Sequence, residues 1–304
     1  NDGAGSDAGH VRIYSWDGSA WAQVGSDIDG EAASDNSGTS VSIDSDGSHV
    51  AIGADYNDGN GSNSGHVRVY SWDGSAWSQV GTDIDGEAAN DRLGFSVSID
   101  SDGSHVAIGA HLNDGTGTNA GHVRIYSWNG SAWSQVGNDI DGEAANDLSG
   151  ISVSMDSDGS HVAIGAPYND GSGTNSGHVR VYSWNGSAWS QVGNDIDGEG
   201  IYDQSGYSVS IDSDGSHVAI GAPYNNGGAN DTGHVRIYSW DGSAWSQVGL
   251  DIEGEAANDQ SGYSVSIDSD GSLVAIGAYA NDGNGTSSGH VRVYEYSSGS
   301  WSQV

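Results

Sequence analysis

The feature that most constrains this chain is a repeat of 56 residues. The motif Gly-His-Val-Arg-Ile/Val-Tyr occurs six times at this spacing, beginning at Gly9, Gly65, Gly121, Gly177, Gly233 and Gly289. A fixed period of this length is typical of propellers, solenoids and other arrays, in which one unit cannot bury its apolar face alone. The chain is therefore predicted to consist of copies of one supersecondary unit.

Each unit carries four short strand patterns. In the unit that begins at Gly177, residues 178–184 alternate between polar and apolar, a turn spans 185–188, and a second strand is expected over 189–192. A polar stretch follows, and then strands are expected over 207–211 and 217–222, joined by a tight Asp-Ser-Asp-Gly turn. Four antiparallel strands in a unit of about 50 residues match a propeller blade.

The two hairpins of the unit occur in unequal numbers. The Trp-containing hairpin occurs six times and the Asp-Ser-Asp-Gly hairpin five times. The sequence therefore predicts an all-β fold, a single β-propeller domain over residues 1–304, with five complete blades plus one half blade in a ring of five or six sectors. The unpaired half blade predicts self-association, because a neighbouring chain could complete it.

The second hairpin has a pattern that resembles a known family. Gly-Tyr-Ser-Val-Ser-Ile-Asp at 206–212 precedes the turn, and Val-Ala-Ile-Gly-Ala-Pro at 218–223 follows it. This resembles the FG-GAP repeat of integrin α-subunit β-propellers, and it recurs at 38–54, 94–110, 150–167 and 262–278. The resemblance implies that this hairpin is the inner half of each blade. The family's calcium loop is longer than this turn, and only Asp212 and Asp214 match it.

The net charge of the chain limits the classes of partner that it can bind. The formal net charge is −35, with seven Arg and no Lys, so nucleic acid is excluded because phosphate binding needs clustered cations. No apolar stretch reaches the roughly 18 residues of a membrane span, so membrane insertion is not expected. Strong self-repulsion is better tolerated where salt is high, which favours an extracellular or cell-surface location.

The preferred cation site is an acidic motif, Asp-Ile-Asp/Glu-Gly-Glu, that occurs once in each of five units. Its alternating carboxylates lie close together, which makes calcium the candidate ion, although the sequence establishes no cofactor. The alternative is a solvated loop between blades. The candidate ligands are Asp27, Asp29, Glu31, Asp83, Asp85, Glu87, Asp139, Asp141, Glu143, Asp195, Asp197, Glu199, Asp251, Glu253 and Glu255.

Other recurring polar residues are interpreted as structural. The Asp-Ser-Asp-Gly segments supply too few oxygens for calcium and are predicted to be plain turns. The arginine of each Gly-His-Val-Arg motif, such as Arg180, is expected to pair with a nearby carboxylate. Histidines recur at two positions, as in His178 and His217, and are interpreted as structural because they lie on separate strands.

Two further motifs point to sugars. Each Trp-Asp/Asn-Gly-Ser-Ala-Trp turn is predicted to hold a cross-strand indole pair, and the alternative is a glycan-stacking platform made by Trp16, Trp21, Trp72, Trp77, Trp128, Trp133, Trp184, Trp189, Trp240 and Trp245. Asn-x-Ser/Thr sequences in predicted loops are candidate N-glycosylation sites at Asn60, Asn129, Asn185, Asn230 and Asn284.

The predicted function rests on the absence of a recognisable catalytic constellation in the repeats. They are nearly identical, and no nucleophile, base and oxyanion constellation stands out, so the sequence predicts no enzyme. We expect a non-enzymatic extracellular structural protein, a subunit of a surface or filamentous assembly. The alternative is a calcium-dependent or lectin-like adhesin, with glycans as partners.

Overall fold

The computed structural model describes residues 5–304, which form β-strands, turns and loops and no helix. The half blade holds β1 (His10–Val11), β2 (Tyr14–Trp16), β3 (Trp21–Gln23) and β4 (Ile28–Asp29). Blades 1 and 2 hold β5 (Ser40–Ile43), β6 (His49–Ala54), β7 (His66–Trp72), β8 (Trp77–Gln79), β9 (Ile84–Asp85), β10 (Ser96–Ile99), β11 (His105–Ala110), β12 (His122–Trp128), β13 (Trp133–Gln135) and β14 (Ile140–Asp141). Blades 3 to 5 hold β15 (Ser152–Met155), β16 (His161–Ala166), β17 (His178–Trp184), β18 (Trp189–Gln191), β19 (Ile196–Asp197), β20 (Ser208–Ile211), β21 (His217–Ala222), β22 (His234–Trp240), β23 (Trp245–Gln247), β24 (Ile252–Glu253), β25 (Ser261–Ile267), β26 (Leu273–Ala278), β27 (His290–Ser297) and β28 (Ser300–Gln303).

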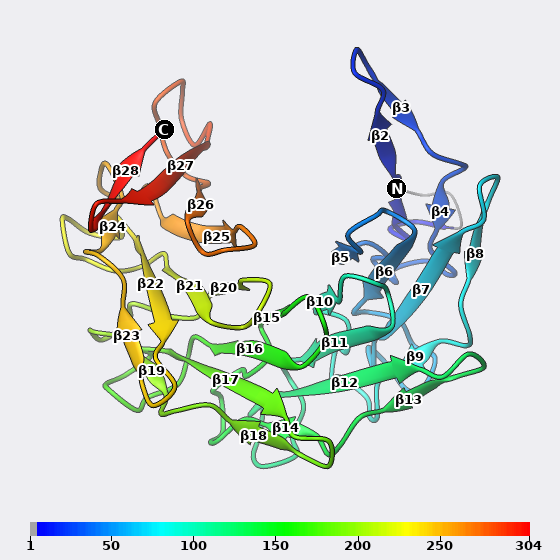
Figure 1. The fold of residues 1–304 in the computed structure, drawn as a ribbon. Helices are drawn as coiled ribbons and strands as arrows, with labels where there is room; N and C mark the ends of the chain where they lie inside the picture. Colours follow the sequence, from blue (N-terminus) through cyan, green and yellow to red (C-terminus); the bar gives the residue numbers. More distant parts are fainter. Residues whose placement is uncertain (1–4) are drawn as a thin grey trace.

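Each complete blade is one antiparallel sheet in chain order. Blade 1 runs β5-β6-β7-β8, and blades 2 to 5 repeat this order with the corresponding strands. Figure 1 shows the blades as an arc, with the half blade at one end, blade 5 at the other and the β5-type strands toward the inside. The predicted all-β propeller architecture, with five complete blades and a half blade, is confirmed.

The sequence pattern did not predict one short strand that occurs in the half blade and in blades 1 to 4. Residues 193–206 were predicted to be a polar stretch, but β19 pairs with the start of β17, with Ile196 opposite Val179 and Asp197 opposite His178. The side chain of Ile196 is buried and joins the apolar core beside Val179. A two-residue strand is too short for alternation to reveal, so the prediction was wrong here.

The core lies between blades rather than within them. Val123 and Ile125 on β12 pack against Val153, Met155 and Ile164 of the next blade. Such clusters recur from one blade to the next, because the alternating apolar residues of each sheet face a neighbouring sheet. Folding of each blade therefore depends on its neighbours, as expected for a repeat array.

The innermost strands approach one another so closely that the contact requires glycine. In blade 3, a Cβ on Gly165 would overlap the backbone carbonyl oxygen of Gly206 in blade 4. The same overlap would occur between Gly109 and the carbonyl of Gly150. The repeated glycines of the two inner strands are therefore explained by close approach of backbones.

The two ends of the arc expose apolar residues that are buried in the middle. Val41 on β5 is 53% exposed, whereas its counterpart Val97 is 9% exposed. On β27, Val291 is 67% exposed, whereas its counterpart Val235 is fully buried. The exposed faces of β5 and β27 therefore correspond to the faces that pack together between neighbouring blades in the middle of the arc.

Self-association through the half blade, like the extracellular location, stays a prediction. If two copies associate through the exposed faces, replacing Val41 and Ile43 with serine is expected to shift sedimentation velocity profiles toward the monomer. The reason is that each valine or isoleucine loses the apolar area that it would bury in the contact. A wild-type protein that remains monomeric at high concentration would contradict the prediction.

Candidate metal centre

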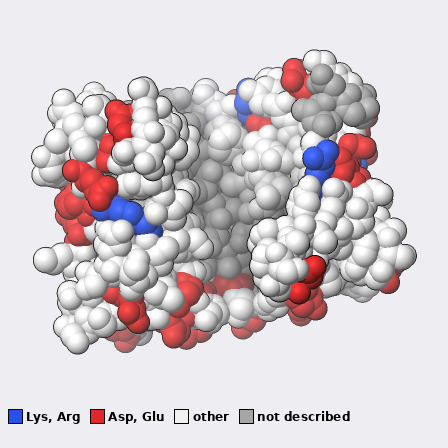
Figure 2. Space-filling view, turned by 90° about the horizontal axis from the view of Figure 1, so that it is seen from above, with Lys and Arg blue, Asp and Glu red and all other residues white. Residues whose placement is uncertain are grey.

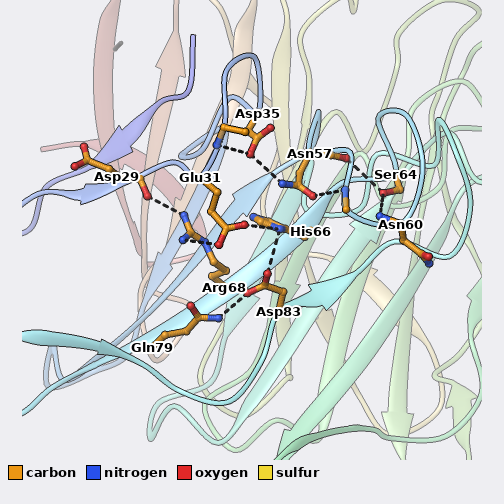
Figure 3. A network of polar contacts seen from close by, with 12 residues as sticks. Asp29, Glu31, Asp35, Asn57, Asn60, Ser64, His66, Arg68, Gln79 and Asp83 are labelled. Carbon is orange, nitrogen blue, oxygen red and sulfur yellow. Dashed lines mark hydrogen bonds and ion pairs between the residues drawn. The ribbon is translucent and has the colours of Figure 1, made fainter. Parts of the chain in front are cut away.

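Among the described residues, a cluster of one histidine and two carboxylates lies at four of the five junctions between neighbouring blades, the half blade included (Figure 3). In the first cluster, Glu31 follows β4 of the half blade, His66 begins β7, and Asp83 precedes β9. His66 Nδ1 lies 3.9 Å from Glu31 Oε2 and 3.9 Å from Asp83 Oδ2. Three further clusters among the described residues repeat it: Glu87, His122 and Asp139; Glu143, His178 and Asp195; Glu199, His234 and Asp251.

The histidines of these clusters are buried and neutral. Burial, aided by the neighbouring arginine, lowers the pKa of His122, His178 and His234 to about 4. At neutral pH each ring therefore keeps one nitrogen without a proton. Nδ1 of His234 is buried, has no hydrogen-bond partner and lies 3.7 Å from Asp251 Oδ2. A buried ring nitrogen beside carboxylates, yet beyond hydrogen-bond range of them, could serve as a metal ligand.

Neighbouring side chains hold both carboxylates in place. Gln79 Nε2 donates to Asp83 Oδ1 at 2.6 Å, which leaves Oδ2 facing His66. Arg68 donates through Nη2 to the backbone oxygen of Asp29 at 2.9 Å, and its Nη1 lies 3.4 Å from Glu31 Oε1. The predicted pairing of the repeated arginines with carboxylates is confirmed, and the pair joins two blades. Such second contacts fix the orientation of metal ligands.

The structure divides the predicted acidic motif between two sites. Its last glutamate and the first aspartate of the following copy meet at one histidine, as Glu31 and Asp83 do. The middle acid is not in the clusters of the described residues, and its backbone oxygen accepts from arginine, as in Asp29, Asp85, Asp141, Asp197 and Glu253. Asp27 instead pairs with Arg12 at 2.9 Å, and Glu255 lies 3.7 Å from His290.

Sequence reasoning missed the histidine. His66 lies opposite Asp85 in the register of β7 and β9, a pairing between segments that are 19 positions apart. The interpretation of this histidine as purely structural rested on its isolation from other ligands along the sequence. Pairing of the Gly-His-Val-Arg strand with the acidic motif would have revealed it, but the two-residue β9 gave no signal.

The Asp-Ser-Asp-Gly segments form turns that hold a second set of histidines. Asp100 accepts from the backbone N–H of His105 at 3.0 Å, and its other oxygen lies 2.7 Å from His105 Nδ1. The hydrogen bond to aspartate raises the pKa of His105, and the same contact raises the pKa of His161 and His217. Both carboxylate oxygens of Asp100 thus serve local contacts, as the plain-turn interpretation expects.

The raised pKa values of these histidines predict that the folded protein loses stability at alkaline pH. Because their pKa values are raised in the folded protein, their stabilisation is complete below the unfolded value of about 6.5 and is lost as pH rises through the folded value. The triple variant His105→Leu, His161→Leu, His217→Leu is expected to lack this loss in urea denaturation between about pH 6 and pH 9. Leucine already occupies this repeat position at Leu273. An equally steep fall in the variant would contradict the assignment.

The tryptophan pairs connect neighbouring blades. Trp184 and Trp189 face each other across their hairpin with ring centroids 5.5 Å apart, which confirms the cross-strand pair. Trp189 Nε1 donates to the backbone oxygen of Val136 in the preceding unit at 2.8 Å. Only the outermost pair, Trp16 and Trp21, is mostly exposed among the described pairs. Glycan stacking on these rings stays a prediction.

The candidate glycosylation sites all lie in turns or loops. Asn129 and Asn185 accept backbone hydrogen bonds within their hairpin turns, as in the 3.0 Å bond from Ser187 to Asn185. Asn60 donates to the backbone oxygen of Gly86 at 2.8 Å, so its amide is engaged between units. Asn230 and Asn284 lie in exposed loops. Their modification stays a prediction.

Comparison with known proteins identifies the repeat. The profile of the FG-GAP repeat family matches residues 27–70, 79–126, 140–182 and 253–294, which is more than half of the chain. None of the curated proteins compared with the chain matches it. No helix of the described residues is long and apolar enough to cross a membrane.

Solved structures share the fold. A periplasmic gluconolactonase from Pseudomonas aeruginosa is similar at 13% identity and a TM-score of 0.64, over 96% of this chain and 77% of that one. A provisional 6-phosphogluconolactonase from Bacteroides uniformis is similar at 10% identity and a TM-score of 0.61, over 94% and 78%. Hydrazine synthase from Kuenenia stuttgartiensis is similar at 12% identity and a TM-score of 0.57, over 94% and 70%.

These likenesses correct the predicted function. The sequence predicted a non-enzymatic structural subunit of a surface or filamentous assembly, because near-identical repeats offered no specialised site. Proteins named as gluconolactonases share this architecture, so the exclusion of enzymatic function was wrong. At 10–13% identity the likeness shows the fold alone and carries no substrate to this chain.

Proposed function

The chain belongs to the FG-GAP repeat family, and from this premise we propose that it is a propeller that binds divalent transition-metal ions between its blades. The observation that carries the proposal is the buried Nδ1 of His234, which has no hydrogen-bond partner and faces a carboxylate of its cluster. A metal ion bound there would join a glutamate of one blade to a histidine and an aspartate of the next.

The ligand set favours a transition metal over calcium. Calcium takes six to eight oxygen ligands, and each cluster offers an imidazole nitrogen and two carboxylates. Imidazole with carboxylates suits zinc and its neighbours among the first-row metals. Metal–ligand bonds of about 2.1 Å place two ligands of a tetrahedral ion about 3.4 Å apart. The histidine–aspartate separations are 3.7–3.9 Å, and all ligand atoms of a cluster lie within 4.8 Å of one another, so binding requires the side chains to move inward by about 1 Å.

The surroundings of each cluster support binding at neutral pH. The histidine is already neutral, so no proton must leave the ring before a metal binds. The carboxylates lie in a chain of net charge −35, and Figure 2 shows acidic side chains along the outer edges of the molecule. The resulting negative potential favours the approach of cations.

Titration with cobalt(II) tests the proposal. Cobalt bound by a histidine and two carboxylates is expected to give visible absorption bands that zinc abolishes and excess calcium leaves unchanged. Asp197→Asn, which removes the middle acid of the motif, serves as a matched control and is expected to behave as the wild type. Absence of the bands, or their loss on addition of calcium, would contradict the proposal.

A second candidate function is the hydrolysis of sugar lactones. Three protein ligands leave a coordination position for water or substrate, as in catalytic zinc sites, and two proteins of similar fold are named gluconolactonases. The test is hydrolysis of D-glucono-1,5-lactone by the zinc-loaded chain, compared with Asp195→Asn. Equal rates in the two proteins would remove this candidate without affecting metal binding.

A further inference from the structure

The differences between the repeats are concentrated at a few positions. Most of the chain repeats with exchanges such as Ile for Val or Asp for Asn, or varies only in surface loops. Two positions on the inner hairpin vary in chemical class instead. The position directly after the repeated glycine of that hairpin holds Thr39, Phe95, Ile151, Tyr207 and Tyr263. The position directly after the second strand holds Asp55, His111, Pro167, Pro223 and Tyr279.

A third variable position lies three residues before the first. It holds Asn36, Arg92, Leu148, Gln204 and Gln260. All three positions flank the open end of the inner hairpin, opposite its Asp-Ser-Asp-Gly turn. Because the inner hairpins lie side by side around the arc (Figure 1), these residues gather at one axial end, which we call the variable mouth.

The variable mouth has a polar side and an aromatic side. On the polar side, Arg92 Nη1 lies 3.6 Å from Asp55 Oδ2, and its guanidinium lies 3.8 Å from the ring centroid of Tyr56. On the aromatic side, the ring of Tyr263 lies 4.9 Å from that of Tyr207 and 4.4 Å from that of Tyr279. Near-identical repeats thus build one asymmetric surface, which the predicted absence of a specialised site overlooked.

Polar atoms of the mouth lack partners. His111 is 7% exposed, its ring lies 4.0 Å from that of Phe95, and its buried Nδ1 has no hydrogen bond. The Oε1 atoms of Gln204 and Gln260 are also buried without a partner. Burial and the charge of Arg92 lower the pKa of His111 to about 4, so its ring is neutral. Buried polar atoms without partners are rare, and three of them belong to residues of the mouth, close to its aromatic rings.

We propose that the variable mouth binds a neutral sugar ring. Aromatic faces stack on the C–H face of a sugar, and sugar hydroxyls can donate to the glutamine oxygens and pair with the histidine nitrogen once these side chains turn toward the ligand. A purely apolar ligand would leave those atoms unpaired. An anion would meet an arginine already paired with Asp55 in a chain of net charge −35. The proposal does not rest on metal binding, since its residues are outside the metal clusters.

Saturation-transfer NMR with D-glucose, D-galactose, D-mannose, D-xylose and N-acetyl-D-glucosamine tests the proposal. At least one sugar is expected to receive magnetisation from the protein. The variant His111→Pro, Tyr207→Ile, Tyr263→Ile is expected to lower affinity for that sugar at least tenfold. Each replacement already occupies the same repeat position elsewhere in the chain, so the local fold accepts it.

Two controls keep the outcome clear. Leu250→Asn changes a variable residue outside the mouth to the residue found at Asn138 and Asn194, and it is expected to bind as the wild type. His111→Pro alone is the fallback if the triple variant does not fold, and it is expected to weaken binding. Absence of transfer to every sugar, or equal affinity in the mouth variant that folds, would overturn the proposal. Cobalt binding is expected in all these variants, so the outcome is separate from that of the metal sites.

Discussion

The variant Gly165→Ala is expected to lose about 3 kcal/mol of unfolding free energy, the upper end of the usual cost of overpacking. The new methyl group would overlap the backbone carbonyl oxygen of Gly206 in the next blade, and neither strand can retreat without disturbing its own ladder. Equilibrium denaturation in urea measures the change, with the midpoint and the slope reported separately.

The chain supplies a matched control for this variant. Gly277 occupies the same repeat position in blade 5, where the nearest contacts of an added Cβ would be with Ser264 and not with another blade. A serine hydroxyl can rotate away, whereas a backbone carbonyl cannot. Gly277→Ala is therefore expected to cost much less than Gly165→Ala. Equal losses in the two variants would show that the contact between blades does not impose the glycine.

Zinc is expected to stabilise the folded chain strongly. Each ion would hold ligands from two blades that separate on unfolding, and a site at a hundredfold excess of zinc over its Kd contributes about 2.7 kcal/mol. Several sites act together, so a large rise in the urea midpoint is expected on adding zinc and a return to the metal-free value with a chelator. Calcium at the same concentration is expected to have little effect.

Variants of one acidic motif separate binding from general charge effects. Asp195→Asn removes a cluster ligand but keeps an oxygen that can accept from Gln191. Asp197→Asn removes a carboxylate of the same motif that lies outside the clusters. The first variant is expected to gain less stability from zinc than the second. The same gain in both would mean that zinc acts by screening the acidic surface.

The propeller could be predicted from the sequence because its signals are local and repeated. Alternation over 178–184 and the Asp-Ser-Asp-Gly turn each define strands within a few residues, and the 56-residue period multiplies the evidence. The FG-GAP pattern then gave the inner and outer halves of each blade. The extra strand at Ile196–Asp197 was missed because its burial depends on packing between blades.

The candidate metal site could be predicted only in part. The acidic motif identified Glu143 and Asp195, but these residues belong to different copies of it and meet at His178 through strand pairing. No spacing within one copy of the motif indicates that these three residues lie together. The variable mouth was overlooked for a related reason, since Tyr207 of blade 4 becomes a neighbour of Tyr263 of blade 5 only when the blades assemble.

The stoichiometry of bound zinc tests the central claim most directly. The described residues hold four complete clusters, so equilibrium dialysis followed by metal analysis is expected to find four zinc ions per wild-type chain. The same measurement is expected to find three in Asp195→Asn and four in Asp197→Asn. Less than one ion per chain in the wild type, or equal occupancy in all three proteins, would contradict metal binding between the blades.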